Sequence, residues 1–131
     1  MKRYMFAFLT VLLISAPLFA HHSFMGQYDL SKTVVLKGAV TKVEWENPHI
    51  GINIDVTDER GVVTNWTIES APPAALVSRG WTRTTLKAGD RITIEACPAR
   101  KGTPFAAAKV VMLADGRRLL AHSDGVTPTG R

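Results

Sequence analysis

Apolar and polar residues alternate along most of the chain after residue 32, which is the period of β-strands that bury one face. The clearest alternation runs from Ile50 to Val56, with isoleucine or valine at every second position. Similar runs, separated by breaks rich in Gly, Pro and Asp, predict strands over residues 33–45, 49–56, 62–69, 91–97, 107–113 and 117–121. The pattern therefore predicts an all-β protein.

The first of these runs contains a break in its own alternation. Its apolar phase slips by one residue, from Leu36 and Val40 to Val43 and Trp45. A slip inside a long strand is typical of a β-bulge or a sharp bend, and Gly38 makes such a bend easier. A first strand that bends can take part in both halves of a small barrel.

One short helix is expected between the third and fourth strands. Ser70 is a suitable N-cap, the two prolines after Ala71 fit a first helical turn, and Gly80 fits the position after a helix end. Three strands, a short helix and two or three further strands predict an OB-fold-like, five- to six-stranded Greek-key barrel. Another small β-sandwich or barrel is the alternative.

The first twenty residues follow the pattern of a secretory signal peptide. Lys2 and Arg3 precede an apolar run over residues 5–14, and Ala20 is the small residue expected before a cleavage site. We expect cleavage after Ala20 and export to the periplasm. The apolar run is short for a membrane span, so no stable membrane insertion is expected after cleavage. A retained signal anchor is the alternative.

Signal removal leaves residues 21–131, enough for one domain. We expect a single barrel domain over residues 21–122 and a flexible tail over residues 123–131, which are polar and contain Gly and Pro. Two basic residues leave with the signal, so the formal charge falls from +5 to +3. A modest positive charge on an exported protein argues against nucleic acid as a partner and is compatible with weak attraction to anionic envelope components.

The chain has one cysteine, Cys97, so it cannot form an internal disulfide. Cys97 follows an alternating run, which predicts a small, half-buried thiol near a strand end. A reactive thiol or an intermolecular disulfide is the alternative.

Several short motifs are similar to those of a known family. They are Ala20-His21-His22-Ser23-Phe24, Leu36-Lys37-Gly38 with Val40, Val43-Glu44-Trp45, Asn47-Pro48-His49, Trp66 with Glu69, Arg79-Gly80-Trp81-Thr82-Arg83, Leu86-Lys87-Ala88-Gly89-Asp90, Ala99-Arg100-Lys101-Gly102 and Ala114-Asp115-Gly116-Arg117. In this combination the chain resembles domain-of-unknown-function family 6152 (DUF6152), small exported bacterial proteins. The resemblance covers nearly all of the chain after the signal. It implies an exported protein of Gram-negative type and assigns no catalytic residues.

The leading functional hypothesis is a metal site at the new amino terminus. After cleavage, His21 offers its α-amine and imidazole to one ion, His22 adds a second imidazole, and His49 or His122 can complete the set. Nitrogen ligands in a near-planar arrangement suit Cu(II) best, and imidazole also suits zinc and nickel. The alternative is that His21 and His22 are a solvated spacer, because the chain has no CxxC or HExxH motif.

The second hypothesis is a binding edge for a small ligand or an envelope partner, without metal. Trp45, Asn47 and His49 lie around the loop between the first two strands, a loop that binds ligands in OB-folds. The basic loop over residues 98–103 extends this edge. For His49 the alternative is a histidine that ends the turn and is hydrogen-bonded to a local backbone carbonyl. Trp66 lies in the same phase of the alternation as Ile68, so we expect it in the core and not at this edge.

A hydrolase that uses two carboxylates is a third hypothesis. It needs two acids that face one cleft, one of them with a raised pKa. Most of the acidic residues concerned lie beside turns or on outward phases; they are Glu44, Glu46, Asp55, Asp58, Glu59 and Glu69. No serine lies in a GxSxG motif. The chain is therefore expected to act by binding and not as an enzyme.

Overall fold

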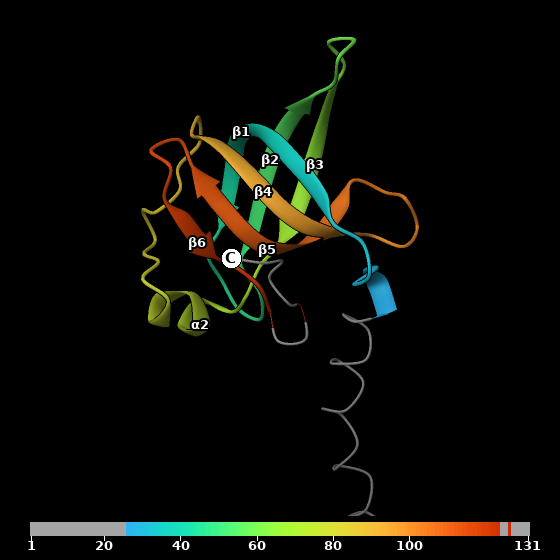
Figure 1. Cartoon of the computed structure of the whole chain (residues 1–131). Helices are drawn as coiled ribbons and strands as arrows, with labels where there is room; N and C mark the ends of the chain where they lie inside the picture. The colour runs from blue at the N-terminus through green and yellow to red at the C-terminus, as the bar shows by residue number, and fades with distance from the viewer. Residues whose placement is uncertain (1–25, 124–125, 127–131) are drawn as a thin grey trace, which may run out of the picture.

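The computed structural model of the protein describes residues 26–123 and Val126, and it confirms the all-β barrel with one short helix (Figure 1). Its elements lie close to the predicted ranges. They are β1 (Val34–Glu44), β2 (Gly51–Thr57), β3 (Val63–Glu69), α2 (Pro73–Ser78), β4 (Arg91–Pro98), β5 (Phe105–Leu113) and β6 (Arg118–Leu120).

Five strands close into the barrel and the sixth is added at one edge. The strand order is β3-β2-β1-β4-β5-β6, with antiparallel neighbours throughout. The barrel closes where β3 pairs with β5 in parallel, Thr67 opposite Phe105 and Glu69 opposite Ala107. Further along β5, residues 110–112 pair with β6. Closure gives each of β1 to β5 hydrogen-bonded neighbours on both sides, which removes the exposed edges of an open sheet.

Strand β1 bends as its slipped pattern predicts. Residues 34–39 pair with β4, residues 39–44 pair with β2, and the register with β2 shifts between Val40 and Lys42. Gly38 lies near this bend, where a Cβ atom would come within 2.3 Å of the carbonyl oxygen of Asp55. The missing side chain therefore allows β1 to approach β2 closely enough to turn the corner.

The inward-facing positions of the alternating runs form the core. Ile52 and Ile54 on β2, Ile68 on β3 and Ile94 on β4 are fully buried, as the period of two requires. Trp66 packs against the same cluster. Figure 1 shows α2 at the end of the barrel opposite the turn between β2 and β3.

The predicted helix forms, but Ser70 is not its N-cap. Helix α2 begins at Pro73, with Pro72 as N-cap and no capping side chain. The backbone N–H of Ser70 instead donates to Ile50, extending the β2–β3 pairing beyond the strand ends, and Ser70 Oγ donates a 2.7 Å bond to the carbonyl of Ala121. Ser70 is fully buried, and it lies two positions before the N-cap residue Pro72. Its side chain therefore does not cap the helix.

A second, smaller cluster packs against the outside of the barrel. It consists of Tyr28, Cys97, Ala99, Ala107 and Val126, with Leu30 beside it. Tyr28 is 1% exposed and forms an isolated β-bridge with Ala99, so it fixes the segment before β1 to the barrel. Cys97 is fully buried rather than half-buried, because this cluster covers its strand end.

The predicted organisation of the chain ends is only partly within the described region. The expected tail begins at Ser123, yet Ser123 and Val126 are buried, so these two positions pack with the domain. The expected signal peptide over residues 1–20 lies outside the described residues, as do His21 and His22. Within the described part of the chain, no helix is both long and apolar enough to span a membrane.

Candidate functional site

The three predicted ligand-edge residues occupy different surroundings. Trp45 is half-buried and packs partly against the core, and its carbonyl accepts a long, 3.4 Å bond from Arg83. Asn47 is exposed, in a loop that leaves β1. His49 is half-buried, just before β2, and takes part in a network of polar side chains. The structure thus singles out His49 among the three.

The imidazole of His49 is held through its Nδ1 atom. Nδ1 lies 3.1 Å from the carbonyl oxygen of Ser70 and 3.3 Å from Ser123 Oγ. The Ser123 hydroxyl itself donates to the same Ser70 carbonyl at 3.1 Å. A carbonyl oxygen only accepts, so this geometry favours the tautomer with the proton on Nδ1. Nε2 then carries the lone pair.

Glu69 lies on the Nε2 side of the ring. Its Oε1 atom is 3.7 Å from His49 Nε2, and its Oε2 atom accepts a 2.7 Å bond from the Tyr28 hydroxyl. Burial, together with the hydrogen bond to the Glu69 carboxylate, raises the pKa of Tyr28. The phenol therefore remains a hydrogen-bond donor at neutral pH, and it holds the carboxylate by one oxygen.

Barrel closure brings these residues together from distant parts of the sequence. Glu69 ends β3 and pairs with Gly51, so the hairpin places it beside the entry to β2, where His49 lies. Tyr28 comes from the segment before β1, and Ser123 follows β6. Four segments of the chain therefore meet at one end of the hairpin.

Sequence reasoning identified His49 but not its partners, Glu69 and Ser70. Glu69 is one of six candidate carboxylates and, with Trp66, part of the family resemblance, but nothing in its local pattern places it beside His49. The turn over residues 58–61 carries the signal for this placement, because a hairpin across it pairs Gly51 with Glu69. For Tyr28 and Ser123 no local signal exists, since their places depend on packing between distant segments.

Ser123 contacts His49, and His49 lies beside Glu69, which resembles the nucleophile, base and acid of a catalytic triad. The Ser123 hydroxyl, however, donates to the Ser70 carbonyl, and the residue is only 6% exposed. These contacts fix the orientation of the imidazole and do not present a nucleophile to a substrate. Three of the other candidate acids have separate local contacts: Asp58 accepts backbone bonds within the β2–β3 turn, Asp55 accepts from Asn65, and Glu44 pairs with Lys42. This distribution does not support a pair of carboxylates facing one cleft.

A complete metal site is not visible in the described region. Across residues 26–123 and Val126, no group of three or more His, Cys, Asp or Glu side chains is arranged to hold an ion. His49 and Glu69 form a pair of potential ligands. A third ligand would have to come from residues outside the described range, which include His21 and His22.

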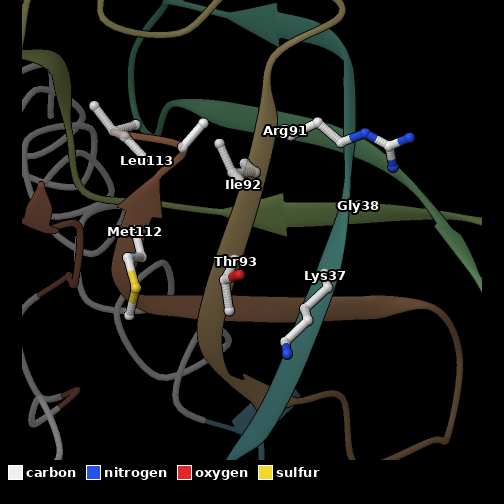
Figure 2. A pocket seen from close by; sticks show the side chains of 8 residues that line it. Lys37, Gly38, Arg91, Ile92, Thr93, Met112 and Leu113 are labelled. Carbon is white, nitrogen blue, oxygen red and sulfur yellow. The ribbon is translucent and has the colours of Figure 1, made fainter. Parts of the chain in front are cut away.

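Two surface hollows that are lined by described residues lie elsewhere on the barrel. The first has a volume of about 260 Å³, and residues of β1, β4 and β5, with Ala114, line it. Figure 2 shows Lys37 from β1, Arg91 and Thr93 from β4, and Met112 from β5 around it. A second hollow of about 220 Å³ shares Arg91 and extends toward Arg117. None of the lining residues comes from the loop of His49, so the hollows and the His49 network are separate features.

Comparison with known proteins gives a family and no activity. A search of curated proteins finds no match to the chain. A family profile, described as a family of unknown function, matches residues 10–107 and therefore spans most of the barrel. The chain belongs to the DUF6152 family.

Proposed function

We propose that the protein is exported, cleaved after Ala20, and binds a metal ion in the periplasm, with copper preferred over zinc. The α-amine and imidazole of His21, the imidazole of His22 and the imidazole of His49 supply the ligands. Nitrogen donors of this kind match Cu(II). The proposed role is binding, without catalysis.

One observation carries this proposal. Tyr28 is fixed to the barrel and bonds to Glu69, whose carboxylate lies beside His49. His21 precedes Tyr28 by only seven positions, and seven residues of extended chain span at most about 25 Å. The amino-terminal histidines are therefore tethered within reach of His49, although they are distant from it in sequence.

The orientation of His49 also supports a ligand role. A metal-binding histidine usually donates its second ring N–H to a carbonyl or a carboxylate, which fixes the tautomer. In this protein Nδ1 has such a contact with the Ser70 carbonyl. The carbonyl is not the local one that the alternative for His49 predicts, since Ser70 lies 21 positions away, and the contact is compatible with metal binding through Nε2.

The decisive experiment compares two amino termini. The protein exported and cleaved by the cell is purified, its intact mass is measured, and its Cu(II) affinity is determined by competition with a chelator. A matched form carries Met-Gly-Gly-Ser before His21, so that four added residues separate the α-amine from the imidazole of His21. We expect the extended form to lose at least ~100-fold in affinity, because a chelating pair becomes a single imidazole. Equal affinity would disprove the amino-terminal site.

Histidine variants complete this test. His49→Gln should weaken Cu(II) binding by the cleaved protein. His122→Gln is the matched variant, because the sequence offers His122 as the alternative residue that completes the ligand set. A loss in His122→Gln and none in His49→Gln would assign this ligand to His122 and contradict the role proposed for His49.

The second candidate function is binding of a small ligand or an envelope partner without metal. The hollow of Figure 2 favours it, because Lys37 and Arg91 contribute two cationic side chains to its lining. An anionic ligand would suit this surface. The edge formed by Trp45, Asn47 and His49 is the other location for such a ligand.

Mutations distinguish the hollow from the loop edge as the place where the ligand binds. Binding of an anionic probe such as inorganic phosphate is measured for the wild-type protein with and without EDTA. A metal-free binding module should retain its affinity in EDTA. Loss in the Arg91→Ala variant would locate the ligand in the hollow, and loss in Trp45→Ala would locate it at the loop edge. Sensitivity to EDTA would contradict this second function.

A further inference from the structure

We propose that two copies of the protein associate through an open edge of β3, where residues 63–66 of the two copies pair as antiparallel strands. None of these residues belongs to a proposed ligand set. The dimer is therefore independent of metal binding, and it adds an interaction surface to the proposed binding functions.

The open edge exists because barrel closure covers only part of β3. Strand β5 pairs with residues 67–69 of β3, and in the described part of the chain β2 is the one strand beside residues 63–66. Closure therefore removes the open edge of β3 only where β5 runs beside it. Figure 1 shows the β2–β3 hairpin extending beyond the barrel. Residues 63–65 are exposed at this edge.

The backbone of β3 directs hydrogen-bonding groups toward the open edge. In an antiparallel strand, the N–H and C=O groups of successive residues point alternately to one side and to the other. The N–H of Thr67 donates a 3.0 Å bond to the carbonyl of Pro104, away from β2. Val63 and Asn65 have the same direction as Thr67. Their backbone groups therefore face the open edge, where no other described residue bonds to them.

A second copy of β3 supplies matching partners for these groups. When Val63 of one copy lies opposite Asn65 of the other, each such pair exchanges two backbone hydrogen bonds. The twofold axis then passes beside Thr64, and the Thr64 side chains of the two copies form a favourable cross-strand pair. Such a contact uses the same surface on both copies, so it closes at two copies and does not continue into a fibre.

The two ends of the open edge carry opposite charges. At one end, the β2–β3 turn contains Asp58, Glu59 and Arg60, so two acids and one base give a net charge of −1. At the other end, the loop between β4 and β5 contains Arg100 and Lys101, a charge of +2. Figure 1 shows the turn at the top and this loop at the right.

Antiparallel pairing brings the acidic turn of each copy to the basic loop of the other. In the proposed register residue 61 of one copy lies opposite Thr67 of the other, beside the loop that ends at Pro104. Opposite charges therefore meet at both ends of the dimer, which favours this direction of pairing over the parallel one. The side chains of Glu59 and Lys101 are exposed, and no described residue pairs with them.

The edge also lacks the features that usually prevent strand pairing. Exposed edges of natural sheets commonly carry lysine or proline, whereas residues 63–66 contain neither. Val62 and Val63 are 55% and 57% exposed beside this edge. The contact involves fewer residues than the roughly 20–30 per partner of a stable interface. The dimer should therefore be weak, and its charged ends should make it sensitive to salt.

The first test measures association of the cleaved, full-length protein in EDTA by sedimentation velocity, at concentrations from ~5 to ~500 μM. We expect a monomer–dimer equilibrium that shifts toward the monomer in ~0.5 M NaCl. Val63→Lys places a charge on the edge and should weaken the dimer at least ~tenfold. Val77→Lys is the matched control, because Val77 is also 57% exposed but lies on α2, at the opposite end of the barrel. It should change the dissociation constant less than ~twofold.

Charge reversal tests the direction of pairing. Glu59→Lys and Lys101→Glu each remove the attraction of opposite charges at both ends, and each should weaken the dimer at least ~fivefold. An equal mixture of the two variants should associate more tightly than either variant alone, because lysine at one position then meets glutamate at the other. No recovery in the mixture would contradict the antiparallel arrangement.

Amide hydrogen exchange gives a readout that does not depend on side-chain charge. Raising the protein concentration should slow exchange at Val63 and Asn65, whose N–H groups gain partners, and have little effect at Thr64, whose N–H faces β2. Far-ultraviolet circular dichroism and Tm check the fold of each variant. If Val63→Lys does not fold, the charge reversals at the exposed turn and loop decide. A monomer at ~500 μM, open-ended oligomers or equal effects of Val63→Lys and Val77→Lys would overturn the proposal.

Discussion

The Tyr28 hydroxyl donates a 2.7 Å hydrogen bond to Glu69, 41 positions further along the chain. This contact joins the segment before β1 to the end of β3. It also holds a carboxylate next to His49. Burial and this contact raise the pKa of the Tyr28 phenol, and the contact fixes the carboxylate beside the candidate ligand His49.

The first prediction concerns alkaline stability. The pKa of Tyr28 is raised above its ordinary value of 10.0, mainly by burial, so the folded state retains the proton that the unfolded chain loses. The stability contributed by the neutral phenol should be complete below pH 10 and should decrease as the pH rises above it. Tyr28→Phe should remove this part of the pH dependence, as measured by urea unfolding between pH 8 and pH 11.

A direct measurement of the same pKa is available. The sequence contains two tyrosines, Tyr4 and Tyr28, and Tyr4 lies in the expected signal. Ultraviolet absorbance at high pH would then follow Tyr28 alone in the cleaved protein. Titration at an ordinary tyrosine pKa in the folded state would contradict the buried contact with Glu69.

The second prediction concerns the bend in β1. In Gly38→Ala the new methyl group would lie 2.3 Å from a backbone oxygen of Asp55, which cannot rotate away. We expect a loss of at least ~2 kcal/mol in the free energy of unfolding. Urea unfolding measures it.

Gly51→Ala is the matched control for this substitution. The added methyl group would lie 3.3 Å from Glu44 Oε2, the end of a flexible side chain that can move. Neither Gly38 nor Gly51 has a positive φ, so backbone strain does not distinguish them. We expect a change within ~1 kcal/mol. Equal losses at both positions would show that close strand approach is not the reason for Gly38.

The third prediction concerns a buried lysine. Lys109 is 4% exposed, and its Nζ atom donates a 2.6 Å bond to Thr33 Oγ1. Thr33→Val removes this acceptor from a buried ammonium group and should cost about 1–3 kcal/mol. Thr41→Val removes an exposed, 3.3 Å contact with Asn65 and should cost less than ~0.5 kcal/mol. Similar unfolding midpoints for the two variants would argue against a structural role for the Lys109 contact.

The fourth prediction concerns the single thiol. Cys97 is fully buried, and burial raises its pKa although nearby Lys109 opposes the shift. The thiol should react with Ellman's reagent at least ~100-fold more slowly in the native protein than in urea.

An exposed thiol provides the control for this measurement. Val35 is 59% exposed, so Val35→Cys in a Cys97→Ala background should be labelled rapidly without denaturant. Rapid labelling of Cys97 in the native protein would instead support the reactive or intermolecular role that remained open from the sequence.

The order of the strands along the chain was predictable from the sequence because its signals are local. Alternation identified β2, the phase slip identified the bulge in β1, and Asp115-Gly116 identified the turn between β5 and β6. Each of these signals reflects which face of one strand is buried, and this depends on residues that are close in sequence. The prediction that Ser70 is the N-cap was wrong because Ser70 is hydrogen-bonded to Ile50 and Ala121.

The candidate site depended on tertiary structure for a different reason. The sequence alone placed His21 and His22 directly after the predicted cleavage site at Ala20 and put His49 on a polar phase. Only the closed barrel decided that His49 faces Glu69, that Tyr28 holds this carboxylate and that Ser70 orients the imidazole. These contacts join residues 20 to 41 positions apart, and no periodicity encodes them. They exist because closure of the β3–β5 pair and packing of the Tyr28 segment fix distant backbones relative to one another.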